Sequence, residues 1–118
     1  MITKGQSGAV TAFTAVAADQ SIGDVAVTSG VNCEGFRYAA VEVALGNADN
    51  QWTVTPLFLN GAADAWLYGE PVTVSGADGV RQSLDLLVQS TPGLAFLCNG
   101  SSGTTPTITI KVRPYSGG

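Results

Sequence analysis

Cys33 and Cys98 are the side chains best suited to nucleophilic or redox chemistry in this sequence, which contains no histidine. Without an imidazole, the chain lacks the commonest general base and the commonest zinc ligand, so Ser-His-Asp and Cys-His catalysis are excluded. Neither cysteine belongs to a CxxC pair, and two sulfurs alone would leave a tetrahedral zinc site two ligands short. Because residues 1–8 show no secretory signal, we expect two reduced, buried thiols rather than a disulfide.

The carboxylates are the remaining groups with acid–base capacity. A glycosidase would need two of them roughly 5–10 Å apart across a cleft. Most of them stand beside Gly, Asn or Ser in predicted turns, where a short acceptor caps backbone N–H groups, so turn formation is the preferred interpretation. The loop with Asn47, Asp49 and Asn50 offers oxygen ligands for calcium as an alternative, although the spacing of an EF-hand is missing. We therefore predict a protein that is not an enzyme and has no catalytic residue, cofactor or metal.

The surface is predicted to be largely neutral, because charged residues make up only 12% of the chain, about half the share of a typical soluble protein. Such a surface is typical of a chain covered by other subunits, although a monomer rich in exposed Ser, Thr and Asn is the alternative. The net charge of −4 leaves no basic stripe for a phosphate backbone, so we expect no nucleic-acid partner. No apolar stretch approaches the length of a membrane span, and we expect no membrane partner.

Alternation of apolar and polar residues predicts a fold that is almost entirely β-sheet. In residues 107–113, Ile108, Ile110 and Val112 share one face, and Pro114 is expected to close the strand. In residues 36–45, Glu42 falls on the face opposite the valines, so that face meets water or a partner. Further strands are predicted at 8–18, 24–28, 51–55, 57–59, 65–68, 71–75, 82–89 and 93–97, with a bulge or edge position at Pro56 and a short helix as the alternative over 81–88.

About eight or nine short strands, with turn residues roughly every ten positions, favour an all-β, antiparallel sandwich, which we assign to the jelly-roll type. The fifteen glycines agree with this fold, since tight reversals often need the positive φ angles that glycine adopts. We place a flexible arm at residues 1–8, a single sandwich domain at 9–115 and a flexible tail at 116–118.

The large aromatic residues have two interpretations. Trp52 shares the parity of Val54 and is expected to point inward, whereas Trp66 and Tyr68 stand near glycines and are expected close to a loop. A packed core or a subunit interface is the preferred role for these three side chains. The alternative is a carbohydrate-binding sandwich, in which exposed Trp66 or Tyr68 would stack on sugar rings while Asn60 or Asp64 bonds hydroxyl groups.

Three segments carry a resemblance to a known class of proteins: FRYAAVEV at 36–43, QWTVTPLFLNG at 51–61 and GEPVTVSG at 69–76. In their short, Ala-, Gly- and Thr-rich strands they resemble small virion structural proteins of tailed bacteriophages. The resemblance implies a capsid decoration or cement protein that is assembled in the host cytoplasm, forms a homotrimer and binds and stabilises the shell of major capsid protein. A neck or tail component of the virion is the alternative within the same class.

On this hypothesis, many weak clamps on one shell act together through avidity, so each copy needs only modest affinity. The neutral strand faces at 10–17 and 52–59 are then expected to form subunit contacts, and the arm at 2–8 to contact a capsid neighbour. The predicted interface residues are Ile2, Val10, Phe13, Trp52, Phe58, Trp66 and Tyr68.

Overall fold

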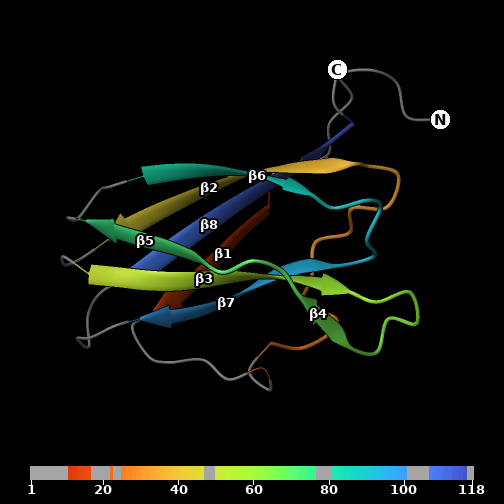
Figure 1. Ribbon diagram of the computed structural model, residues 1–118, viewed down its shortest axis with the longest axis horizontal. Helices are drawn as coiled ribbons and strands as arrows, with labels where there is room; N and C mark the ends of the chain where they lie inside the picture. The colour runs from red at the N-terminus through yellow and green to blue at the C-terminus, as the bar shows by residue number, and fades with distance from the viewer. Residues whose placement is uncertain are drawn as a thin grey trace.

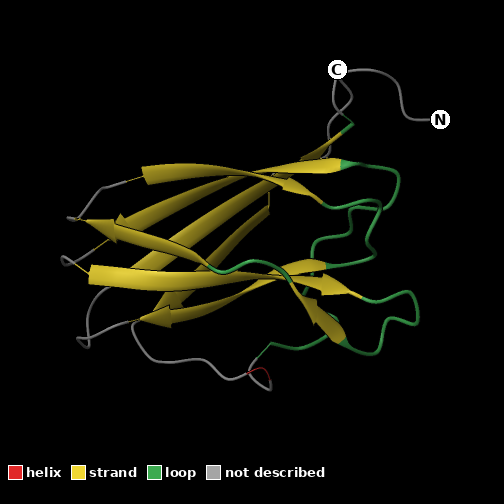
Figure 2. Ribbon diagram, viewed as in Figure 1, coloured by secondary structure: helices red, strands yellow, loops and turns green. Residues whose placement is uncertain are grey.

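The chain folds as a sandwich of two antiparallel β-sheets (Figures 1 and 2). The computed structural model describes residues 11–16, 22, 25–46, 50–76, 81–100 and 107–116. Within these ranges there is no α-helix, and the all-β class predicted from the sequence is confirmed. The strands are β1 (Thr11–Val16), β2 (Tyr38–Gly46), β3 (Asn50–Leu59), β4 (Trp66–Tyr68), β5 (Val72–Gly76), β6 (Arg81–Leu87), β7 (Leu94–Gly100) and β8 (Thr107–Tyr115).

The order of the strands is that of a jelly roll. Sheet A has the order β1-β8-β2-β6. In sheet B, β3 pairs with β7 on one side and with β5 and β4 on the other, and Val31 bridges to Leu94 beside β7. Four of the seven connections between the eight described strands pass from one sheet to the other, and Val31 joins sheet B between β1 and β2. This order matches the double Greek-key pattern of the fold. In Figure 1, sheet B lies toward the viewer and sheet A passes behind it.

The main core lies between the sheets and follows directly from side-chain alternation. In β2, every second residue from Ala39 to Leu45 is buried, and Ile108, Ile110 and Val112 of β8 are buried beside them. Sheet B contributes the opposite wall of this cluster through Trp52, Val54, Val74, Leu94, Phe96 and Cys98. The predicted inward face of 107–113 is confirmed.

A second, smaller cluster lies on the other face of sheet B. Leu57, Leu59, Trp66 and Ala95 are buried there, and Val25 and Val27 pack over them from the loop that precedes Val31. The Trp66 indole Nε1 donates a 3.0 Å hydrogen bond to the Val25 carbonyl oxygen, which ties this loop to β4. Sheet B is thus partly covered on its outer face, while sheet A is not covered by any described segment.

Two predictions around prolines are wrong in detail. The strand β3 runs through Pro56 without interruption, and β8 runs past Pro114 to Tyr115. The Pro56 carbonyl accepts a hydrogen bond of 2.8 Å from the amide of Gly69, on the side of β3 where β4 and β5 pair. The N–H and C=O of one strand residue point to the same side, so the position where proline lacks an N–H also faces β4 and β5. Residue 56 falls between the residues that pair with β5 and those that pair with β4, and the sheet loses no ladder bond there.

The strand predicted at 24–28 does not form over its described residues. The chain turns instead, with the Ser29 amide and hydroxyl both donating to the Ala26 carbonyl, at 2.9 and 2.6 Å. The alternating valines in this segment serve the second cluster rather than a ladder, and strand-like pairing begins only at Val31. Residues 81–87 are a strand, as preferred, and not the alternative helix.

Candidate assembly surfaces

The outer face of sheet A gathers most of the positive charge of the chain. Arg81, Lys111 and Arg113 project from β6 and β8, and Arg37 stands immediately before β2. Glu42 and Asp85 are the carboxylates of the same three strands. Arg81 donates to Glu42 across the β2–β6 pair at 3.0 Å, an exposed ion pair of the kind that adds little to stability.

Two tyrosines stack on this face at the end of the sheet. The register pairs Tyr38 with Tyr115, and their rings lie 5.5 Å apart between centroids with an interplanar angle of 26°. The guanidinium of Arg37 lies 5.6 Å from the Tyr38 ring, and that of Arg113 lies 5.5 Å from the Tyr115 ring. Such distances allow cation–π attraction, which holds both rings and both charges in place.

The neighbouring strand extends this arrangement. The Tyr115 hydroxyl donates a 2.6 Å hydrogen bond to the Asp85 carboxylate, which raises the pKa of Tyr115 above its ordinary value because the bond stabilises the neutral phenol. Leu87 lies opposite Tyr38 in the register and is 48% exposed. We call the set of Arg37, Tyr38, Leu87, Arg113 and Tyr115 the tyrosine–arginine patch.

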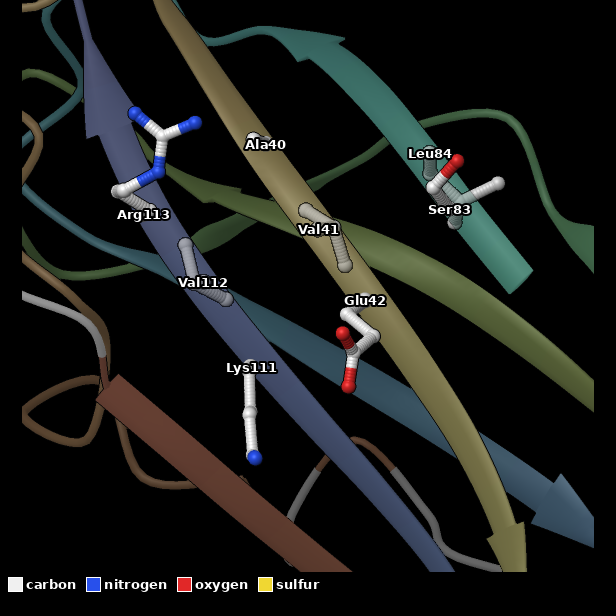
Figure 3. A pocket seen from close by; sticks show the side chains of 8 residues that line it. All are labelled: Ala40, Val41, Glu42, Ser83, Leu84, Lys111, Val112 and Arg113. Carbon is white, nitrogen blue, oxygen red and sulfur yellow. The ribbon is translucent and has the colours of Figure 1, made fainter. Parts of the chain in front are cut away.

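A shallow pocket of about 280 Å³ adjoins the patch (Figure 3). Its lining residues come from β2 and from the two strands beside it, β6 and β8. In Figure 3, the Arg113 guanidinium projects away from Lys111 and Glu42, which lie side by side on β8 and β2. The lining residues are Ala40, Val41, Glu42, Ser83, Leu84, Lys111, Val112 and Arg113.

A second surface lies on sheet B around β4. Leu67 is 56% exposed and Tyr68 is 60% exposed, and the exposed carboxylates of Asp64 and Glu70 flank the strand on both sides. We call Asp64, Leu67, Tyr68 and Glu70 the β4 rim. A groove of about 480 Å³ separates the rim from the end of β6, and its apolar wall includes Phe58, Leu67, Leu87, Val88 and Pro92.

Of the residues predicted to form an interface, some are buried and others are exposed. Trp52 is fully buried in the main core, which confirms its inward direction and leaves it without a surface for contact. Trp66 is 9% exposed and bonded to Val25, and Phe58 is half-buried against the main core. Tyr68 is well exposed, on the β4 rim.

The other three predicted contacts cannot be placed on a surface. Ile2 and Val10, with the arm at 1–8, lie outside the described residues. Phe13 is described only as a backbone position in β1, opposite Ile110. The tyrosine–arginine patch was missed, although the parity that points Glu42 and Lys111 outward also points Tyr38 and Tyr115 outward.

Cys33 and Cys98 are both buried, and they form no disulfide with each other. Burial raises the pKa of Cys33 to about 11 and that of Cys98 to about 12. Hydrogen bonds between Val31 and Leu94 and from the Cys33 amide to the Thr91 carbonyl place Cys33 beside the start of β7, whereas Cys98 lies near the end of that strand. About six residues of extended chain, a backbone distance of roughly 20 Å, thus lie between the positions of the two cysteines.

The groups that a sugar or metal site would use are otherwise engaged or scattered. Asn60 donates to the Asp64 carboxylate at 2.9 Å, and its own side-chain oxygen accepts from the amides of Asp64 and Ala65. Over the described residues, His, Cys, Asp and Glu form no group of three that could hold a metal ion. The calcium loop at 47–50 lies largely outside the residues described. Among the residues that the structure describes, no helix has the length and hydrophobicity of a membrane span.

Comparison with known proteins gives a likeness of fold alone. No protein-family model and no curated protein matches this sequence. A solved structure of Bacillus endospore appendages, described as a novel family of disulfide-linked pili, is similar with a TM-score of 0.52 and 14% sequence identity. The match covers all of this chain and 95% of that one, so the likeness extends over the whole sandwich.

Proposed function

We propose that this chain is a non-enzymatic structural subunit that associates with further copies of itself on a larger protein particle. The observation that carries the proposal is the tyrosine–arginine patch on the outer face of sheet A, which no described segment covers. Tyrosine and arginine are among the residue types most enriched where binding energy concentrates in protein interfaces. Here their rings and guanidinium groups are held by stacking, so a partner would immobilise few additional side-chain rotamers.

The particle we propose is the virion of a tailed bacteriophage, with the chain as a decoration or cement protein on the shell of major capsid protein. The sequence resemblance supports this part, and the likeness in fold to a pilus protein supports the wider class of assembling structural proteins. Linkage of subunits by disulfides is not part of the proposal, because both described thiols are buried. A homotrimer remains the proposed oligomer, and a neck or tail position is the alternative within the virion.

A carbohydrate-binding role has less support. It needs an exposed aromatic ring beside free polar groups, but Trp66 is buried and the Asn60 and Asp64 side chains are bonded to each other. Tyr68 is the remaining exposed ring of the two, and the polar groups of Asn60 and Asp64 are already paired with each other.

The proposal is tested by the mass of the purified protein in solution, measured by light scattering over a range of concentrations. We expect assemblies above the 12.0 kDa monomer, with a trimer near three times that mass. Co-sedimentation with shells of major capsid protein then tests the partner. A protein that stays monomeric at millimolar concentration and low salt would refute the proposed self-association, and one that does not sediment with shells would refute the proposed partner.

A further inference from the structure

Charge is distributed unevenly between the two candidate surfaces. The face of sheet A, with Arg37, carries four cations against two carboxylates, a net charge of +2, so the rest of this chain of total charge −4 carries −6. Among the described residues away from this face, Glu34, Asp64 and Glu70 are charged and all three are acidic. Two of these three flank the exposed β4.

The two surfaces also match in their apolar parts. The tyrosine–arginine patch combines two stacked rings and exposed Leu87 with positive charge, and the β4 rim combines exposed Leu67 and Tyr68 with negative charge. Apolar centres surrounded by complementary charges are the arrangement that gives affinity through burial and specificity through electrostatics. The patch and the rim are thus complementary to each other in both apolar surface and charge.

Pairing of either surface with itself is disfavoured. A twofold contact between two copies of the patch would oppose Arg37 and Arg113 to the same cations, and a twofold contact between two rims would oppose Glu70 to Glu70. The patch belongs to sheet A and the rim to sheet B, and the groove lined by both Leu87 and Leu67 lies between them. The two surfaces share no residue, so one copy offers one surface of each kind.

We propose that copies of this chain associate head to tail, with the tyrosine–arginine patch of one copy against the β4 rim of the next. This inference rests on the proposed function, since it names the surfaces through which the self-association takes place. A contact of this kind forms a ring if its rotation closes, which a trimer requires, and an open filament if it does not. The attraction between exposed charges is screened by salt, so the assembly is expected to weaken as ionic strength rises.

The test uses two variants that each lose one surface. The patch variant carries Arg37→Glu and Arg113→Glu, and the rim variant carries Tyr68→Ser and Glu70→Ser. All four side chains lie on the surface, and circular dichroism and thermal melting check that each variant folds. Glu34→Ser is the control for the rim, because it removes the same charge from a turn outside β4. Should a double variant fail to fold, Arg113→Ser and Glu70→Ser alone replace it.

Each variant alone is expected to associate at least ~30-fold more weakly than the unchanged protein, and the control to associate as before. An equimolar mixture of the two variants retains one intact patch and one intact rim, so it is expected to form a dimer of about 24 kDa that does not grow further. A mixture that stays monomeric, or variants that assemble like the unchanged protein, would overturn the head-to-tail contact and leave self-association intact. An unchanged protein that is itself monomeric would instead refute the proposed function.

Discussion

Replacing Gly30 by alanine should weaken the attachment of the loop that covers the outer face of sheet B. A Cβ atom at this position would lie 2.9 Å from the Gly93 Cα and 3.0 Å from both the Gly93 carbonyl carbon and the Leu94 amide nitrogen. All three are backbone atoms, so no side chain can rotate away to make room. The adjacent bridge, in which Val31 and Leu94 exchange hydrogen bonds of 2.8 and 2.9 Å, must shift instead.

The expected cost is that of overpacking a closed site, about 1–3 kcal/mol of the free energy of unfolding. For 118 residues, an unfolding entropy of roughly 2.1 cal/mol/K per residue gives a total near 0.25 kcal/mol/K. The melting temperature of Gly30→Ala should therefore fall by about 4–12 °C. Differential scanning calorimetry measures this change, and amide exchange should show faster opening at Val31 and Leu94.

Gly61→Ala is the matched control, because a Cβ atom there would have no neighbour within 4 Å. This variant should melt within about 2 °C of the unchanged protein, or above it, since alanine restricts the unfolded chain. The reasoning would be refuted if Gly30→Ala melted with the unchanged protein, or if both substitutions lowered the melting temperature equally.

Two further predictions concern titrating groups. Because folding raises the thiol pKa values to about 11 for Cys33 and about 12 for Cys98, the thiols should not change the free energy of unfolding below pH 9. Above pH 9 each thiol should lower it by about 1.4 kcal/mol per pH unit, up to its pKa in the folded protein. Urea unfolding at pH 8 and pH 10 measures the fall, and a Cys33→Ala, Cys98→Ala variant with the same pH dependence would contradict it. Replacing Asp85 by asparagine should lower the pKa of Tyr115, because the carboxylate that favours the neutral phenol is lost. Ultraviolet titration of the phenolate tests this, with a Tyr115→Phe variant identifying the signal, and an unchanged curve would speak against it.

Much of the fold could be predicted because the direction of a side chain along a strand is a local property. Alternation with a period of two placed Ile108, Ile110 and Val112 inward and Glu42 outward, and it placed Trp52 in the core. The number of strands and the jelly-roll type followed from the spacing of turn residues, and the eight described strands agree with them.

The wrong predictions concern residues whose role depends on contacts far along the chain. Val25 and Val27 alternate like a strand, but they pack over Trp66, which lies far along the chain, while the strand-like bridge forms at Val31. Pro56 indicated an interruption, but it lies where β3 changes neighbours and no ladder bond is needed. Neither outcome is encoded within a window of ten residues.

The candidate site depended most on the tertiary structure. Alternation along residues 107–113 is enough to place Lys111 and Arg113 away from the core, and the composition alone shows that the chain lacks the imidazole of common catalytic constellations. Only the register between β2 and β8 stacks Tyr38 on Tyr115 and gathers the scattered cations on one face. Period-two alternation decides on which side of its own strand a residue lies, but strand order and register are decided by the packing of the whole sandwich.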